Sequence, residues 1–182
     1  MTYSNRIQIA QATTDWAKSL AQRSTHFVTL NPHRPARFDR GGVNTRGSDA
    51  HALLRRWDAY VNCDLIGKRW QEAGMRHLRC EWVAYPEGHE LNRHWHLLWR
   101  LSADLYPERV DRAINDHLIR STTYERQLEH LLNWHWKRVI PSGTCVIREV
   151  SSPDGLAFYA TKEQIFTDNQ ASFITSKEFH TS

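Results

Sequence analysis

The sequence contains few cysteines, and none of them forms a paired motif. Cys63, Cys80 and Cys145 are the only thiols among 182 residues, an odd number without CxxC spacing. A disulfide framework and a cysteine-based zinc site both require more thiols in closer spacing. The sequence therefore indicates neither, and the expected location is the reducing cytoplasm.

Long apolar runs are also missing. No stretch of the sequence approaches the roughly 18 consecutive apolar residues that a membrane-spanning helix needs. The first residues, Met-Thr-Tyr-Ser-Asn-Arg-Ile, lack the apolar segment of a signal peptide. We therefore expect neither secretion nor a membrane partner.

Repeats, low-complexity tracts and internal linkers are absent as well, which predicts one continuous domain. The 182 residues, of which 40% are hydrophobic and eight are tryptophan, can bury a core of two or three layers. A second catalytic module does not fit in this length. The expectation is a single domain over residues 1–182, with a polar C-terminal tail from about residue 167.

Positive charge is in modest excess. The formal net charge is +4 and the isoelectric point is about 9.1. Such an excess favours a polyanionic partner, although it is also common among proteins that bind no nucleic acid. One expected loop after Pro32 is rich in arginine, and it could hold a nucleic-acid backbone or simply be solvated. Its arginines are Arg34, Arg37, Arg40 and Arg46.

Helices and strands alternate along the chain. Apolar side chains recur every four residues from Leu53 to Leu65, which predicts a long amphipathic helix. Thr122-x-x-Glu125 resembles a capping box, and Ser152-Pro153 supplies an N-cap and a first-turn proline. The expected helices cover residues 13–22, 48–73, 108–119, 122–136 and 153–166, and the expected strands cover residues 27–30, 78–84, 94–101 and 145–150.

The two central strands flank a turn that contains Pro86-Glu87-Gly88, which is typical of an antiparallel hairpin. Helices interleaved with strands around such a hairpin predict an α+β sandwich, in which helices cover a central antiparallel sheet. One face of that sheet could remain open for a ligand.

The strand at residues 94–101 carries two histidines. Alternation sends His94, His96, Leu98 and Arg100 to one face, while Trp95, Leu97, Trp99 and Leu101 face the core. Imidazoles at i and i+2 lie about 6 to 7 Å apart, close enough to bind one divalent ion. Imidazole suits Mn, Zn, Co or Ni and can share a Mg site with oxygen ligands. An isolated His-x-His pair is also compatible with two structural histidines, so this motif alone does not decide the function.

The last expected helix contains Tyr159-Ala160-Thr161-Lys162. The i, i+3 spacing puts the phenol of Tyr159 and the ammonium of Lys162 on one face. A phenol has a pKa near 10, so a nucleophilic tyrosine needs a nearby cation or metal that favours the phenolate. Lys162 could supply that charge or neutralise a phosphate. Taken alone, the pair also fits an ordinary helix surface.

The three motifs together resemble the rolling-circle replication initiators and related HUH endonucleases. Those proteins combine a strand ending near Thr-Leu-Asn, a His-hydrophobic-His strand and a helix with Tyr-x-x-Lys. The matching segments here are Phe27 to Pro32, His94-Trp95-His96 and Tyr159-Ala160-Thr161-Lys162, so the resemblance spans roughly residues 25–165. It implies an RRM-like or ferredoxin-like sandwich with a central antiparallel sheet flanked by helices.

The resemblance also implies a chemistry. A divalent ion, Mg²⁺ or Mn²⁺, on His94 and His96 would bind the scissile phosphate, and Tyr159 would attack it to form a 5′-phosphotyrosyl link. Because Tyr124 lies in a different element, the single-tyrosine type is indicated. The expected partners are single-stranded or hairpin DNA at an origin and a helicase from the host or from a separate gene. Arg100 and the arginine-rich loop are the candidate DNA contacts.

The family usually adds a third polar ligand, often a carboxylate a few residues before the two histidines. Glu87 is the preferred candidate, because the hairpin can fold its side chain back across the neighbouring strand. A solvated turn glutamate is the alternative. The other candidate ligands are Glu90, His89 and Glu81.

Three other functions stay open. A transposase of the same chemistry shares the His-x-His pair and the tyrosine but differs in its partners and dimer architecture. A non-catalytic binding module on an RRM-like sheet would instead carry aromatic side chains on the open face. A zinc hydrolase would use His89, His94 and His96, with Tyr159 incidental. Trp134 and Trp136 cannot both face one side of a helix, so one of them could be exposed for base stacking.

Overall fold

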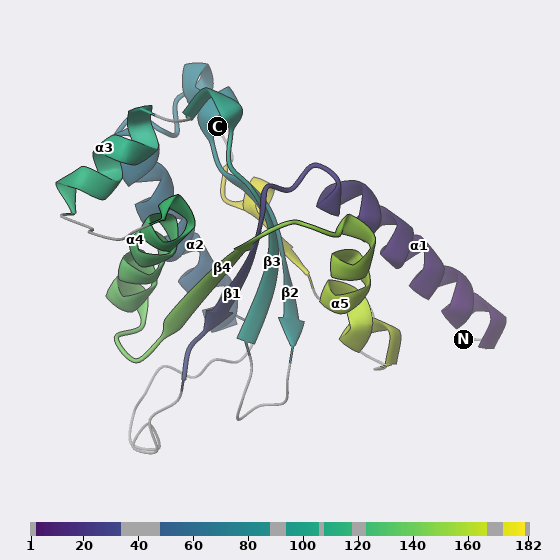
Figure 1. Ribbon diagram of the computed structural model, residues 1–182. Helices are drawn as coiled ribbons and strands as arrows, with labels where there is room; N and C mark the ends of the chain where they lie inside the picture. Colours follow the sequence, from purple (N-terminus) through teal and green to yellow (C-terminus); the bar gives the residue numbers. More distant parts are fainter. Residues whose placement is uncertain are drawn as a thin grey trace.

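The computed structural model describes residues 3–33, 48–87, 94–105, 108–117, 123–166 and 173–180. Within these ranges it describes only the backbone of residues 3–7, 9–10, 48–50 and 161–166. The described chain contains five α-helices and five strands (Figure 1). The helices are α1 (Tyr3–Ala21), α2 (Ser48–Ile66), α3 (Glu108–Asp116), α4 (Tyr124–Val139) and α5 (Pro153–Phe166). The strands are β1 (His26–Asn31), β2 (Glu81–Glu87), β3 (His94–Arg100), β4 (Thr144–Glu149) and β5 (Ile174–Thr175).

The strands form one antiparallel sheet in the order β4-β1-β3-β2-β5. Helices α2, α3 and α4 lie on one side of this sheet, and α1 and α5 lie on the other (Figure 1). The expected α+β sandwich is therefore confirmed, with the helix-flanked antiparallel sheet of a ferredoxin-like fold. No helix in the described ranges combines the length and the apolar character needed to cross a membrane.

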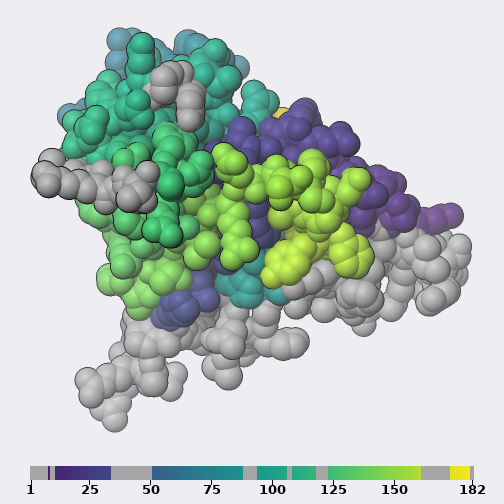
Figure 2. Space-filling view, viewed as in Figure 1, coloured from purple at the N-terminus to yellow at the C-terminus, as the bar shows by residue number. Residues whose placement is uncertain are grey.

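The alternation expected for β3 separates two apolar cores. Trp95, Leu97 and Trp99 belong to the larger core, which also contains the buried stripe of α2. Leu98 points to the opposite face and joins a smaller core. In that smaller core α1 contributes Ala17 and Ala21, while α5 contributes Ala157 and Ala160. The small alanine side chains let these two helices approach the sheet and each other, and the light-green α5 segment lies beside the purple α1 in Figure 2.

The largest differences from the expected helix boundaries are in α1 and α2. Helix α1 begins at Tyr3 and not at residue 13, because residues 3–12 contain no proline or glycine that would stop it. Helix α2 ends at Ile66 and does not reach residue 73. Gly67 follows it with a φ of 113°, a left-handed conformation that favours glycine and ends the helix.

Two local assignments are also corrected. The N-cap of α4 is Thr123, whose hydroxyl accepts a hydrogen bond from the backbone N–H of Arg126 at 3.4 Å. The expected cap, Thr122, lies outside the described residues. Pro86 and Glu87 were expected in the hairpin turn, but they are the last two residues of β2. Glu87 therefore lies directly opposite His94 in the register.

The polar tail expected from about residue 167 includes an ordered segment at residues 173–180. Ile174 and Thr175 form the edge strand β5 against β2, and Phe179 is buried in the larger core. The guanidinium of Arg79 donates a hydrogen bond to the carbonyl of His180 at 3.0 Å. The segment is short and mostly polar, so its sequence carries little strand signal, and its pairing depends on a non-local edge of the sheet.

Candidate functional site

His94 and His96 lie at the same end of β3 and on the same face. Their Nε2 atoms are 3.2 Å apart and their rings are nearly perpendicular, at 89°. This Nε2–Nε2 distance is shorter than the roughly 6 to 7 Å between same-face positions of a strand, because both rings turn toward one point. His96 is buried and His94 is partly exposed.

Glu87 completes this group from the neighbouring strand. Its Oε2 lies 3.5 Å from Nε2 of His94 and also contacts Nε2 of His96. One ligand atom from each of these three residues lies within 4.8 Å of the others. We call Glu87, His94 and His96 the sheet cluster. The other candidates are not part of it: Glu81 is at the far end of β2, 3.4 Å from Arg100, and His89 and Glu90 lie outside the described residues.

The donor set of the sheet cluster fits a divalent ion. Two imidazole nitrogens and a carboxylate oxygen suit Mn²⁺ and Zn²⁺, and they can share a Mg²⁺ site when water supplies further oxygen ligands. The side chains of Glu87 and His94 are 15% and 23% exposed, so the group has one side toward solvent. A substrate oxygen could therefore reach an ion held there.

The ring of His96 is fixed from β1. Thr29 lies opposite His96 in the register, and its Oγ1 shares a hydrogen bond with Nδ1 of His96 at 3.0 Å. Phe27 stacks on the same ring, with centroids 5.0 Å apart and planes inclined by 18°. Histidines that bind metals through one ring nitrogen usually bond a polar group through the other, which orients the ring. The sequence motif contains Thr29, but only the strand register shows this contact.

Tyr159 reaches the same place from α5. Its ring centroid is 5.1 Å from that of His96 and 6.0 Å from that of Phe27, and the side chain is 43% exposed. Buried Ala157 and Ala160 hold this helix against the smaller core. Lys162 is in the same helix, but its side chain lies outside the described residues. The structure thus brings Tyr159 together with the sheet cluster.

A cavity of about 630 Å³ lies between the sheet face and α5. Its floor contains Phe27 and Thr29 from β1 and Arg148 from β4, while Tyr159 lines its helical side. His94 and His96 open into it. Arg148 is exposed and pairs with Phe27 in the register, so it offers a positive charge for an anionic ligand. Arg148 lies in an expected strand, but no sequence motif marks it as a site residue.

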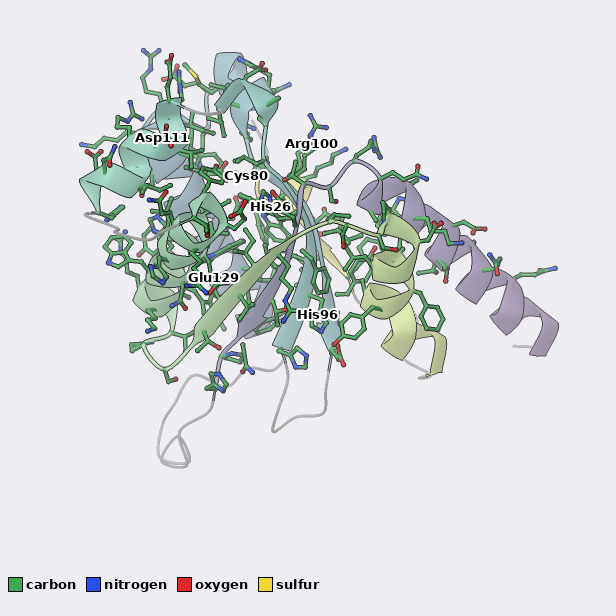
Figure 3. The ribbon with its side chains drawn as sticks, viewed as in Figure 1. His26, Cys80, His96, Arg100, Asp111 and Glu129 are labelled. Carbon is green, nitrogen blue, oxygen red and sulfur yellow. The ribbon has the colours of Figure 1, made fainter. Side chains whose placement is uncertain are left out.

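The expected DNA contacts lie elsewhere or are not described. Arg100 is at the opposite end of β3 from His96, where its guanidinium is 3.4 Å from Glu81 (Figure 3). It borders a different, smaller pocket. The arginine-rich loop lies outside the described residues. It contains Arg34, Arg37, Arg40 and Arg46.

One tryptophan of the Trp-His-Trp stretch is exposed, as expected. Trp134 is 41% exposed and Trp136 is fully buried. Trp134 is on α4, however, which covers the face of the sheet opposite the cavity (Figure 1). A base bound in the cavity therefore cannot stack on Trp134.

Tyr85 is a second tyrosine close to the sheet cluster. It pairs with His96 in the register, but it is fully buried in the smaller core. Burial raises the pKa of its phenol well above the usual value. Its hydroxyl has no hydrogen-bond partner among the described residues. Tyr159, and not Tyr85, is the tyrosine that a ligand in the cavity can reach.

Comparison of the chain with family models, with curated proteins and with solved structures gave no match. The functional interpretation therefore depends on the geometry of the site.

Proposed function

We propose that this chain is a metal-dependent endonuclease that nicks and rejoins single-stranded DNA through Tyr159. The observation that carries the proposal is the 5.1 Å separation between the rings of Tyr159 and His96, which puts a reachable phenol beside a group of three metal-ligand side chains. Tyr159 is far from these three residues in the sequence, yet it lines the same cavity as His94 and His96. A tyrosine nucleophile working with a metal requires such a juxtaposition.

Each residue has a defined task in this proposal. Glu87, His94 and His96 hold Mg²⁺ or Mn²⁺, which when bound acts as a Lewis acid on the scissile phosphate. Thr29 keeps the ring of His96 oriented. Arg148, exposed on the cavity floor, attracts the DNA backbone. Lys162, one turn after Tyr159, favours the phenolate or neutralises the phosphate.

The chemistry exchanges one phosphodiester for another. The phenolic oxygen of Tyr159 bonds to phosphorus, its proton is released, and the bond from phosphorus to the 3′ oxygen breaks. The 3′ oxygen takes up a proton and leaves as a hydroxyl, while the 5′-phosphate stays esterified to Tyr159. The reverse reaction with another 3′-hydroxyl rejoins the strand without ATP.

The proposed substrate is single-stranded or hairpin DNA. A paired duplex cannot enter a cavity of about 630 Å³, so the nucleotide at the scissile phosphate must be unpaired to reach the site. Initiation of rolling-circle replication at an origin, with a helicase encoded elsewhere, is the biological setting that we propose. A transposase would use the same site on paired terminal hairpins. DNA flanking the gene distinguishes the two, since an inverted repeat at an origin favours the initiator.

A covalent adduct tests the proposal directly. The chain is incubated with Mn²⁺ and hairpin oligonucleotides from the DNA that flanks its gene, labelled at either the 5′ or the 3′ end. We expect a protein–DNA adduct that survives boiling in detergent and carries only the 3′ label, since Tyr159 retains the 5′-phosphate. Tyr159→Phe removes the attacking oxygen and keeps the ring, so the adduct should disappear.

Tyr85→Phe is the matched control, because it makes the same change at a buried phenol that pairs with His96. This variant should form the adduct at the wild-type rate. An adduct that persists in Tyr159→Phe would assign the nucleophile to another tyrosine. Detergent-sensitive binding without any adduct would favour a binding module, for which Phe27 on the cavity floor supplies an aromatic surface. Cleavage without an adduct would favour a water-using hydrolase.

A further inference from the structure

A second group of potential metal ligands lies among the helices on the other side of the sheet. Asp64 is on α2, His117 directly follows α3, and His135 is on α4. Oδ2 of Asp64 is 2.7 Å from Nε2 of His117 and 3.0 Å from Nε2 of His135. One ligand atom from each residue lies within 4.8 Å of the others. We call Asp64, His117 and His135 the helix cluster.

Aromatic packing holds both imidazoles of the helix cluster. The ring of Trp134 is 4.1 Å from that of His117, and Tyr60 stacks on His135 with planes inclined by 22°. His135 is almost fully buried, and its Nδ1 has no hydrogen-bond partner among the described residues. Nε2 is therefore the only nitrogen of this ring that is placed to bind a ligand, and it points at the same carboxylate as Nε2 of His117.

We propose that the helix cluster binds a divalent transition-metal ion, with Zn²⁺ the best match, and that this ion ties α2, α3 and α4 together. Two imidazole nitrogens and one carboxylate oxygen are a common zinc donor set. Zinc bonds of 2.0–2.1 Å separate tetrahedral ligand atoms by about 3.3 Å, so small ring rotations convert the observed contacts into ligation. The side chains of Asp64 and His117 are 24% and 19% exposed, which lets a water molecule complete the coordination.

The helix cluster is independent of the proposed nicking site. α2 and α4 pack on the larger core, whereas His96 points to the opposite face of the sheet, toward Thr29 and Tyr159. The two clusters share no residue. Loss of zinc at the helix cluster and loss of DNA nicking can therefore be observed separately.

Zinc stoichiometry and thermal stability test the proposal. The full chain with His94→Ala and His96→Ala, which removes two ligands of the sheet cluster, is dialysed against Zn²⁺ and analysed for metal. We expect one zinc per chain and a Tm that rises with zinc concentration, because the ion binds the folded state. Co²⁺ in place of Zn²⁺ should give the visible absorption of a four-coordinate site.

Adding His117→Gln or Asp64→Asn should abolish the bound zinc, the Co²⁺ absorption and the zinc-dependent rise in Tm. Both residues are partly exposed, so the chain should still fold, which the Tm without zinc checks. His130→Gln is the matched control, since His130 is an exposed histidine on the same helix as His135. It should leave zinc binding unchanged.

The wild-type chain provides a second measurement. His117→Gln should lower its zinc stoichiometry by one, whether or not the sheet cluster also binds zinc. The proposal is overturned if the His94→Ala/His96→Ala chain binds no zinc, or if zinc binding survives both His117→Gln and Asp64→Asn. The helix cluster would then be a hydrogen-bonded network in which Asp64 accepts from two imidazoles.

Discussion

Nδ1 of His96 and Oγ1 of Thr29 lie 3.0 Å apart across the β1–β3 pairing, although 67 positions separate the two residues in the sequence. The contact leaves Nε2 of His96 directed at Glu87. If Nε2 binds a metal, Nδ1 carries the ring proton and donates a hydrogen bond to the hydroxyl oxygen of Thr29. Thr29 is therefore a positioning residue for the sheet cluster.

Thr29→Val should weaken the metal affinity of the sheet cluster by about ten- to hundredfold, which is the usual effect of losing a polar partner behind a metal-bound histidine. Valine keeps the shape and the β-branching, so the strand should remain intact. The measurement is the Mn²⁺ concentration that gives half-maximal adduct formation. Thr144→Val makes the same change on β4, where the hydroxyl contacts His33, and it should have no effect. An unchanged Mn²⁺ requirement in Thr29→Val would show that the hydroxyl does not orient His96.

Glu87→Gln should also weaken metal affinity, since an amide oxygen replaces a charged ligand. High Mn²⁺ should restore part of the activity, because the two imidazoles remain. Glu81→Gln is the control: Glu81 is at the other end of the same strand and pairs with Arg100. Equal losses of metal affinity in the two variants would mean that the general negative charge on β2, and not ligation by Glu87, supports activity.

Short-range patterns predicted the parts of this site that lie within one element. Strand alternation correctly assigned the two faces of β3, and the hairpin expectation led to Glu87. Sequence patterns could not predict the contacts between different elements. The register of β1 against β3, which brings Thr29 to His96, follows from packing, and so does the position of Tyr159 over that ring.

The helix cluster was missed for the same reason. Asp64, His117 and His135 come from three helices, and their spacing of 53 and 71 positions from Asp64 forms no recognisable motif. Only the packing of α3 and α4 against α2 brings these side chains together.

The burial of His26 predicts a pH-dependent stability that is separate from the proposed nicking chemistry. Burial beside Trp99 lowers the pKa of His26 from 6.5 to about 4, although Glu125 acts in the opposite direction. The unfolded chain binds a proton at His26 near pH 6.5 and the folded chain does not until about pH 4. The free energy of unfolding should therefore fall as the pH decreases through this window, by at most about 3 kcal/mol.

Urea unfolding between pH 7 and pH 4 measures this effect. His26→Gln retains a polar group beside the Thr25 hydroxyl, which lies 2.8 Å from Nδ1 of His26, but it cannot titrate. It should flatten the pH dependence of stability. His130→Gln, at an exposed site, should leave the dependence as in the wild type. A slope that is the same in His26→Gln and in the wild type would assign the acid sensitivity to other groups.

His94→Ala and His96→Ala should each abolish adduct formation, while binding of single-stranded DNA largely survives. In the proposed mechanism these imidazoles hold the ion, whereas the charge that would attract the backbone, such as that of Arg148, comes from other strands. Removal of metal from the wild-type chain with a chelator should give the same combination of lost nicking and retained binding. Arg148→Gln should show the converse, with weaker binding, a smaller salt dependence and an adduct that still forms at high DNA concentration. The two measurements are a fluorescence-anisotropy titration and the adduct assay on the same oligonucleotide. Normal nicking by either histidine variant in Mn²⁺ would remove the sheet cluster from the mechanism, and loss of DNA binding in both would mean that the histidines contact the DNA itself.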